Sequence, residues 1–137
     1  ALAKKFRPDA MQVPFSLLDQ RLLQDGALAA LKDLGVEIHA RSIFLQGLLF
    51  LAPERLPEKL KHAAPMLARL HARLREANAT PLAAALSFAR AQENLDYALV
   101  GVTSLAELEE ILGAAPVSLD WTDFALDDEL VLTPSRW

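Results

Sequence analysis

The stretch EIHARSIFLQGLLF, residues Glu37–Phe50, contains the pattern that decides the fold of this 137-residue chain. Its first half, with the residue before it, alternates between apolar and polar side chains: Val36, Ile38 and Ala40 against Glu37, His39 and Arg41. A period of two is typical of a β-strand whose two faces lie in different surroundings. The alternation stops after Ser42, where a loop containing Gly47 leads into a further apolar run. We therefore predict a strand over Val36–Ser42 that is followed by a loop.

The segments on either side predict strands that alternate with helices. The predicted strands are Ala10–Phe15, Val36–Ser42 and the all-apolar Tyr97–Val102. The predicted helices are Ala27–Leu34, a long helix from Pro57, Leu82–Gln92 and Leu105–Leu112. Asp25 is the expected cap of the first of these helices, and Pro65 is expected to break the long helix near Ala64. This order favours a parallel sheet with crossover helices, in which an all-apolar strand is buried on both faces. Because a (β/α)8 barrel needs about 250 residues, the three parallel βα units predict an α/β fold that is part of a TIM barrel.

We predict a single partial domain over residues 1–137. Residues 114–137 are less periodic, and we expect them to form a C-terminal tail that packs on the body, with Asp127 as the cap of a short helix. The first residues have no start methionine and resemble the end of a helix. We therefore expect the chain to begin partway through a longer protein.

The composition argues against several classes of protein and site. The absence of cysteine rules out disulfides and thiolate metal sites and favours the cytoplasm. The net charge of −4 is opposite to the basic face that nucleic-acid binding requires. The longest apolar run, Ile43–Ala52, is too short to span a membrane. His62 and His71 lie nine residues apart, which is not the spacing of metal ligands, and we expect no metal site.

The turn from Gly101 to Ser104 is the first candidate site. It joins the end of a predicted strand to a helix whose Ser104 and Glu107 form a Ser-x-x-Glu capping box. Free backbone N–H groups and the helix dipole at such a turn attract phosphate. An ordinary capped helix start with no ligand is the alternative.

Two polar side chains within the predicted strands are further candidates. Arg41 shares a face with Glu37 and His39, and it lies at the carboxyl end of its strand, where barrels bind ligands. The three side chains could equally form a paired polar layer of the core, an interpretation that we favour for Glu37 and His39. Gln12 has an amide that could bind a carboxamide at the mouth, or it could satisfy neighbouring backbone groups.

Three stretches in order carry a resemblance to a known family: QVPFSLLD at Gln12–Asp19, ARSIFLQGLL at Ala40–Leu49 and VGVTSLAELEEIL at Val100–Leu112. They are similar to the sixth strand, the seventh strand with its loop, and the eighth strand with its helix in the aldo-keto reductases. The resemblance covers nearly the whole chain. It implies the C-terminal half of a barrel that binds NADP(H), with NAD(H) as the alternative, and reduces aldehydes or ketones.

The resemblance implies that nine residues contact the cofactor. Gln12 would lie at the nicotinamide carboxamide, Arg41 on the nicotinamide ring, and Ser42, Phe44 and Gln46 beside the pyrophosphate. Thr103 and Ser104 would lie at the 2′-phosphate of the adenosine, and Glu107 and Glu110 on the helix beside the adenine. The chain departs from the family at two places. Arg41 replaces a stacking aromatic ring, although a guanidinium plane also stacks. No Lys or Arg lies between Gly101 and Gly113, where members that prefer NADPH carry cations.

The catalytic Asp, Tyr, Lys and His of the family belong to its N-terminal half and are missing here. Tyr97, the single tyrosine, lies at the start of its predicted strand and is not the acid that the reaction requires. We predict the cofactor-binding half of a cytoplasmic NAD(P)H-dependent oxidoreductase, inactive alone, whose intact form takes a nicotinamide cofactor and a small carbonyl substrate. The alternative is a non-catalytic half-barrel interaction module that dimerises through its open strand edges.

Overall fold

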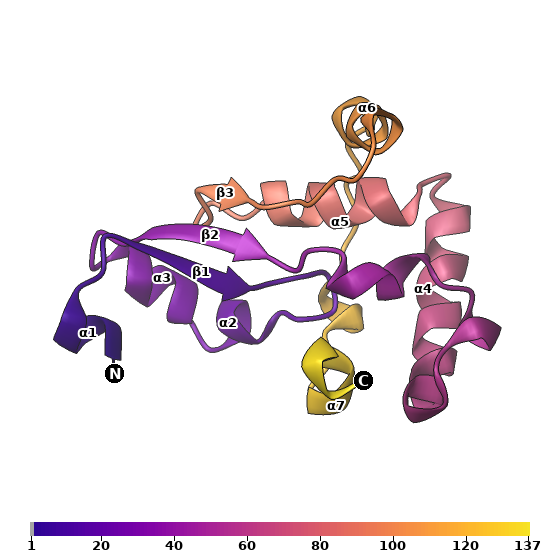
Figure 1. Cartoon of the computed structure of the whole chain (residues 1–137), viewed down its shortest axis with the longest axis horizontal. Helices are drawn as coiled ribbons and strands as arrows, with labels where there is room; N and C mark the ends of the chain where they lie inside the picture. The colour runs from indigo at the N-terminus through magenta and orange to yellow at the C-terminus, as the bar shows by residue number, and fades with distance from the viewer. Residues whose placement is uncertain (1) are drawn as a thin grey trace.

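The fold is built on one three-stranded sheet (Figure 1). The computed structural model describes residues 2–137, and Ala1 lies outside the described residues. Strands β1 (Ala10–Pro14), β2 (Glu37–Arg41) and β3 (Tyr97–Ala98) lie in that order, and both neighbouring pairs are parallel. The predicted parallel α/β arrangement, part of a (β/α)8 barrel, is confirmed.

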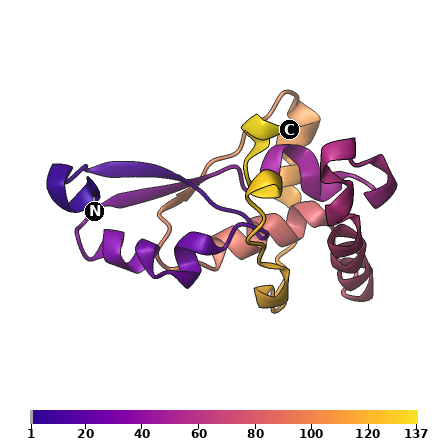
Figure 2. The same ribbon diagram turned by 90° about the horizontal axis from the view of Figure 1, so that it is seen from below.

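Seven helices accompany the strands, and some of them cover one face of the sheet. They are α1 (Leu2–Phe6), α2 (Arg21–Gln24), α3 (Ala27–Lys32), α4 (Ala64–Glu76), α5 (Pro81–Arg90), α6 (Leu105–Gly113) and α7 (Glu129–Leu132). Short 3-10 segments lie at Leu45–Phe50, Pro53–Arg55, Glu58–Ala63, Thr122–Phe124 and Pro134–Arg136. In Figure 2, α2 and α3 run along one side of β1 and β2. We call the opposite side, which none of the described helices covers, the open face.

The alternation along β2 separates a buried face from the open face, as predicted. Val36, Ile38 and Ala40 are at most 1% exposed and pack in the core, while Glu37 and Arg41 are exposed. The register places Gln12 of β1 beside His39 of β2, so both belong to the open face. In a strand that is covered on one side, the alternation of apolar and polar residues therefore predicts correctly which side chains are buried.

The third strand is much shorter and more exposed than its sequence predicts. Only Tyr97 and Ala98 pair with β2, although the expected strand runs to Val102. Tyr97 is 55% exposed and Val102 is 42% exposed. The expectation of burial on both faces is wrong for this chain, because no described strand lies on the outer side of β3 to extend the ladder and cover its side chains.

Local signals place the starts of the helices better than their ends, which differ from the prediction by one or two residues in α3, α5 and α6. The Thr80 hydroxyl accepts a hydrogen bond from Ala83 N (3.1 Å), which caps α5 next to Pro81. The predicted long helix from Pro57 breaks as expected: a 3-10 turn ends at Ala63, and α4 restarts with Pro65 in its first turn. Asp25 Oδ1 accepts from Ala27 N (2.8 Å), but the N-cap residue of α3 is Gly26 and not Asp25 as predicted. The short helix α2 was not predicted.

The C-terminal segment lies against the loop that follows β1. Leu126 N donates to Leu18 O (2.9 Å), and Gln20 Nε2 donates to Trp121 O (2.8 Å). The cap of α7 is Asp128 and not Asp127, because Asp128 Oδ1 accepts from the backbone N–H groups of Leu130 and Val131. These contacts bring the segment to the carboxyl ends of the strands.

Candidate functional site

The carboxyl ends of the three strands meet at one edge of the sheet, which we call the rim. Because the strands are parallel, the loops after Pro14, Arg41 and Ala98 leave the sheet side by side. Phe15 N donates to Arg41 O (3.0 Å) and Leu99 N donates to Ala40 O (2.7 Å), so β2 fixes the start of both neighbouring loops. Three pockets that share lining residues lie along this rim.

The first pocket, of about 400 Å³, lies between the ends of β1 and β2 and the C-terminal segment. We call it the arginine pocket because Arg21 and Arg41 both line it. Arg21 donates to both oxygens of the buried Asp19 (2.8 and 2.9 Å), which raises the pKa of Arg21. Arg41 donates to Ser42 Oγ (3.3 Å) and forms no ion pair with the residues that the structure describes. Arg41 is therefore a cation available to an anionic or planar ligand.

The second pocket, of about 720 Å³, lies between the loop after β2, the start of α5 and α6. We call it the carboxylate pocket because Glu107 and Glu110 line it. Its other lining residues are apolar or uncharged: Phe44, Gln46, Gly47, Phe50, Thr80, Pro81, Leu82, Gly101, Thr103 and Ile111. A smaller pocket of about 380 Å³ shares Ser42, Phe44 and Gln46 with its neighbours, and Gln46 lines all three. The pockets thus form one run along the rim.

The loop that lines all three pockets has an unusual backbone. Ser42, Leu45 and Gln46 have positive φ angles of 61°, 47° and 51°, and Gly47 follows with 82°. Residues other than glycine rarely adopt this left-handed region, because Cβ crowds the backbone there, and such residues cluster at functional sites. The sequence predicts a loop at Gly47, but nothing in the residue types of Ser42, Leu45 and Gln46 predicts their positive φ angles.

The turn before α6 contains the predicted cap, with an unexpected partner. Ser104 Oγ accepts from Glu107 N (3.2 Å), as the capping box requires. The Glu107 carboxylate, however, accepts from Thr103 N (2.6 Å) and from Thr103 Oγ1 (3.0 Å to each oxygen). These bonds, led by the one from the backbone N–H, hold the pKa of Glu107 below its usual range. The Thr103 N–H that we expected to be free for phosphate is therefore occupied by the chain's own carboxylate.

The structure brings together seven of the nine residues that the resemblance assigned to the cofactor: Arg41, Ser42, Phe44, Gln46, Thr103, Glu107 and Glu110 line the run of pockets. Ser104 is not among the lining residues, because its hydroxyl is turned to the cap. Gln12 also lies outside the three pockets. It pairs with His39 two residues before the end of β1, and its exposed side chain belongs to the open face below the rim.

Several lining residues were missed by sequence reasoning. Asp19 belongs to the loop after β1, where Ser16 Oγ accepts from Asp19 N (3.0 Å), and Arg21 is the first residue of α2. A Ser-x-x-Asp spacing directly after a strand was a readable signal for this turn. Phe50 and residues 133–135 carry no such signal, because only the folded chain places them at the rim.

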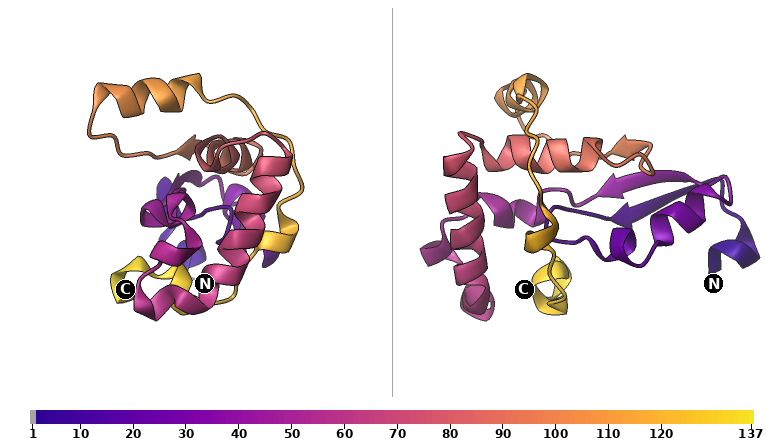
Figure 3. Two further views of the ribbon diagram at one scale, coloured as in Figure 1. Left: turned by 90° about the vertical axis from the view of Figure 1, so that its right-hand side faces the viewer. Right: turned by 180° about the vertical axis from the view of Figure 1, so that it is seen from behind.

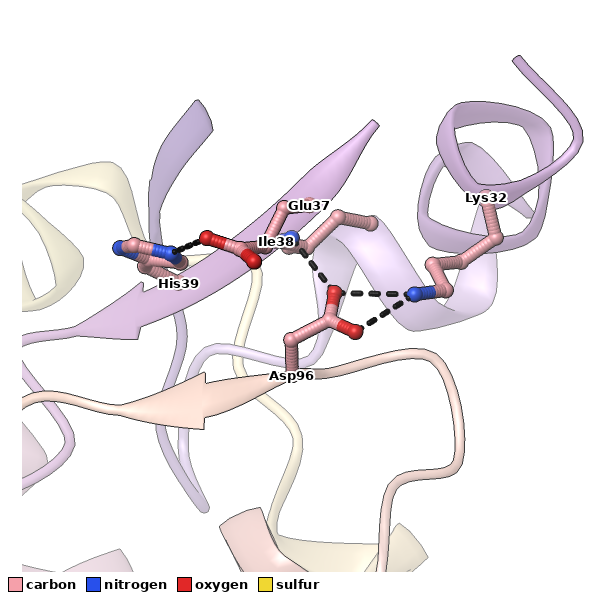
Figure 4. Close-up of polar contacts among 5 residues, drawn as sticks. All are labelled: Lys32, Glu37, Ile38, His39 and Asp96. Atoms are coloured by element: carbon pink, nitrogen blue, oxygen red, sulfur yellow. Dashed lines mark hydrogen bonds and ion pairs between the residues drawn. The ribbon is translucent and has the colours of Figure 1, made fainter. Parts of the chain in front are cut away.

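The opposite end of the sheet contains closed ion pairs (Figure 4). Lys32 Nζ donates to both oxygens of Asp96 (2.7 and 2.9 Å), and Ile38 N donates to the same carboxylate (2.7 Å). The bond from Lys32, followed by that from Ile38, lowers the pKa of Asp96. His39 Nε2 and Glu37 Oε1 lie 2.6 Å apart, so the two residues are paired as expected, but the pair lies on the open face and not in the core. This end ties α3, β2 and β3 together and leaves the free cation Arg41 at the rim.

The described residues contain neither a cluster of metal ligands nor a membrane-spanning helix. Residues 2–137 contain no group of three or more His, Asp or Glu side chains that could hold a metal ion. Within the same residues, none of the helices has the length and apolar character needed to cross a membrane.

The model of the aldo/keto reductase family matches residues 1–131 of the 137-residue chain. The match includes all three strands and every residue named at the arginine and carboxylate pockets except the end of the C-terminal segment. No curated protein matches the chain.

Proposed function

The chain belongs to the aldo/keto reductase family, and we propose that it supplies the cofactor-binding part of an NAD(P)H-dependent oxidoreductase that reduces aldehydes or ketones. The family is one of oxidoreductases that use nicotinamide cofactors. A carbonyl substrate and a nicotinamide dinucleotide are then the partners of the intact protein. We place that protein in the cytoplasm, because the chain contains no cysteine.

One observation carries the proposal: a run of pockets along the rim is lined by seven of the nine residues that the family resemblance selects. These residues come from positions 41 to 46 and 103 to 110, which only the parallel sheet brings together. Ligands in parallel α/β folds bind at the carboxyl ends of the strands. The overlap between the residues selected by resemblance and those that line the rim supports the proposal.

The residues at the rim fit the parts of a dinucleotide. Arg41 offers a cation with a planar face, which suits a phosphate or a nicotinamide ring. The Phe44 and Phe50 rings lie 5.5 Å apart at 54° and offer an apolar wall for the second base. When bound, the reduced nicotinamide supplies hydride for the carbonyl carbon. In this proposal the residues at the rim bind and orient the cofactor, and the proton for the carbonyl oxygen comes from residues outside this chain.

The chain alone should not catalyse the reduction. Proton transfer to the carbonyl oxygen needs an acid within hydrogen-bond reach. Tyr97, the single tyrosine of the sequence, begins β3, and its ring packs edge-on against His39 (5.0 Å) on the open face, outside the three rim pockets. Mixing the chain with NADPH and a reactive aldehyde should give no turnover above background, and turnover would contradict the assignment of catalysis to residues outside this chain.

Cofactor binding is tested directly by calorimetric titration of the folded chain with NADH and NADPH. We expect binding, and we expect Arg41→Ala to weaken it by about tenfold, because a charge-assisted contact contributes about 1.5 kcal/mol. Arg75→Ala is the matched control, since Arg75 is an exposed arginine of α4 that lines none of the rim pockets. A folded chain that binds neither dinucleotide would overturn the proposed function.

The exposed leucines of α6 favour a second candidate, the non-catalytic half-barrel module that dimerises. Leu105 is 70% exposed and Leu112 is 77% exposed, and β3 has no outer neighbour among the described strands. A second copy would cover these surfaces and pair the open strand edge. Sedimentation equilibrium of the chain separates the two functions: a tight dimer without cofactor binding supports the module, and a monomer that binds cofactor supports the oxidoreductase part.

A further inference from the structure

The carboxylate pocket contains ionisable groups of one sign only. Glu107 and Glu110 line it, and no Lys, Arg or His does. Arg41, the free cation of the rim, lines the arginine pocket and not this one. The run of pockets therefore has a cationic part at the end of β2 and an anionic part beside α6.

Glu107 is held in place at the wall of this pocket. Its carboxylate receives the backbone N–H of Thr103 at 2.6 Å and the hydroxyl of the same residue at 3.0 Å. The same bonds lower the pKa of Glu107, so that the carboxylate is charged at neutral pH. An anion that entered the pocket would have to displace this carboxylate from Thr103 or approach it as a like charge.

Carboxylates without a cation favour a neutral, hydroxylated ligand. Ionised carboxylates accept hydrogen bonds and donate none, so they bind the O–H groups of a vicinal diol and repel a phosphate dianion. The volume of about 720 Å³ is within the range of small-ligand pockets, and the Phe44 and Phe50 rings add an apolar wall. These are the properties of a site for a nucleoside whose ribose hydroxyls are free.

We propose that the carboxylate pocket makes this chain select NAD(H) over NADP(H), with Glu107 as the residue that determines the choice. The inference rests on the proposed function and on the family resemblance, which implies that the adenosine end of the dinucleotide lies beside α6. The two cofactors differ only by a phosphate on the 2′-oxygen of the adenosine ribose. Glu107 accepts a hydrogen bond from the free 2′-hydroxyl and opposes the phosphate, and Glu110 adds to the repulsion.

The test compares the affinities of NADH and NADPH for three variants of the full chain. Glu107→Arg reverses the charge at the pocket wall, and Glu107→Gln removes the charge while its side-chain oxygen can still accept from Thr103. Glu109→Arg is the matched control, because Glu109 carries the same charge on the same helix and does not line the pocket. Circular dichroism melts establish that each variant is folded before titration.

The unmodified chain should bind NADH more tightly than NADPH by about tenfold or more, and added salt should reduce the difference because it screens the repulsion. Glu107→Gln should shrink the preference, Glu107→Arg should reverse it, and Glu109→Arg should leave it close to that of the unmodified chain.

Three results would overturn the inference. Equal or tighter binding of NADPH to the unmodified chain would refute it while leaving the proposed function intact. If Glu109→Arg changed the preference for NADH over NADPH as much as Glu107→Arg did, the charge of the whole helix, and not the pocket, would control the preference. Binding of neither cofactor to the folded chain would remove the proposed function, and the inference with it.

Discussion

Helices α5 and α6 begin with similar signals and lie in opposite surroundings. Both follow a hydroxyl cap, Thr80 for α5 and Ser104 for α6, and both carry apolar side chains, although α6 also carries Glu107, Glu109 and Glu110. Yet α5 has seven buried residues and α6 has none. Figure 3 shows α6 standing outside α5, away from β1 and β2. The comparison teaches that local sequence decides whether a helix forms, while its neighbours decide whether its apolar side is buried.

The difference in burial should appear first in stability. Phe88 of α5 is 5% exposed and stacks on Phe15 with ring centres 5.2 Å apart. Phe88→Ala should lower the free energy of unfolding by about 3–5 kcal/mol, because it leaves a cavity in the core. Leu112→Ala, at a 77% exposed position of α6, should change it by less than about 0.5 kcal/mol. Urea denaturation followed by circular dichroism measures both, and similar losses would show that α6 is packed in solution.

Removal of the two helix caps should have different effects on stability. Thr80→Ala should lower the free energy of unfolding by about 1 kcal/mol, because α5 unfolds only with the core. Ser104→Ala should leave the global midpoint almost unchanged and increase hydrogen exchange of the α6 amides alone. If Ser104→Ala lowered the midpoint of global unfolding, α6 would not unfold independently of the core.

Acidification should affect α6 before α5. The pKa of Glu107 is held below the ordinary glutamate value of 4.5 by its bonds from Thr103. A lowered folded pKa gives a stabilisation that is present above the unfolded pKa and is lost as the pH falls through the folded pKa. Protection factors of the α6 amides should therefore fall below about pH 4.5, while those of α5 persist. In Glu107→Gln, which cannot titrate, this selective loss should disappear.

The smallest effect is expected from polar substitutions on the exposed side of α6. Leu105→Lys combined with Leu112→Lys should change the free energy of unfolding by no more than about 0.5 kcal/mol, because neither side chain is buried. Static light scattering should show less self-association, since two exposed apolar side chains are removed. A loss above about 1 kcal/mol would mean that α6 packs on the body in solution.

The elements with local signals were predictable from the sequence. The alternation through Val36, Ile38 and Ala40 gave the buried face of β2, and Thr80 with Pro81 gave the start of α5. Pro65 gave the break before α4. Each of these features depends on residues within one turn or one strand, where sequence and conformation are directly linked.

The candidate site was predictable in part. Arg41 and the Thr103–Glu107 turn were found from strand ends and caps, and the resemblance added Phe44, Gln46 and Glu110. The occupation of Thr103 N by Glu107 was missed, because a capping box predicts a bond to Ser104 and the choice between two adjacent N–H groups depends on the backbone path. Gln12 was placed too near the mouth, because its position depends on where β1 ends relative to the rim.

By itself, the sequence determined the order of strands and helices, their parallel arrangement and the family, because periodicity, caps and motifs are properties of short segments. Only the tertiary structure decided that β3 pairs through two residues, that α6 lies uncovered, and that one pocket is cationic and the next anionic. Burial and electrostatic environment depend on which distant segments lie side by side, and no single segment encodes its neighbours.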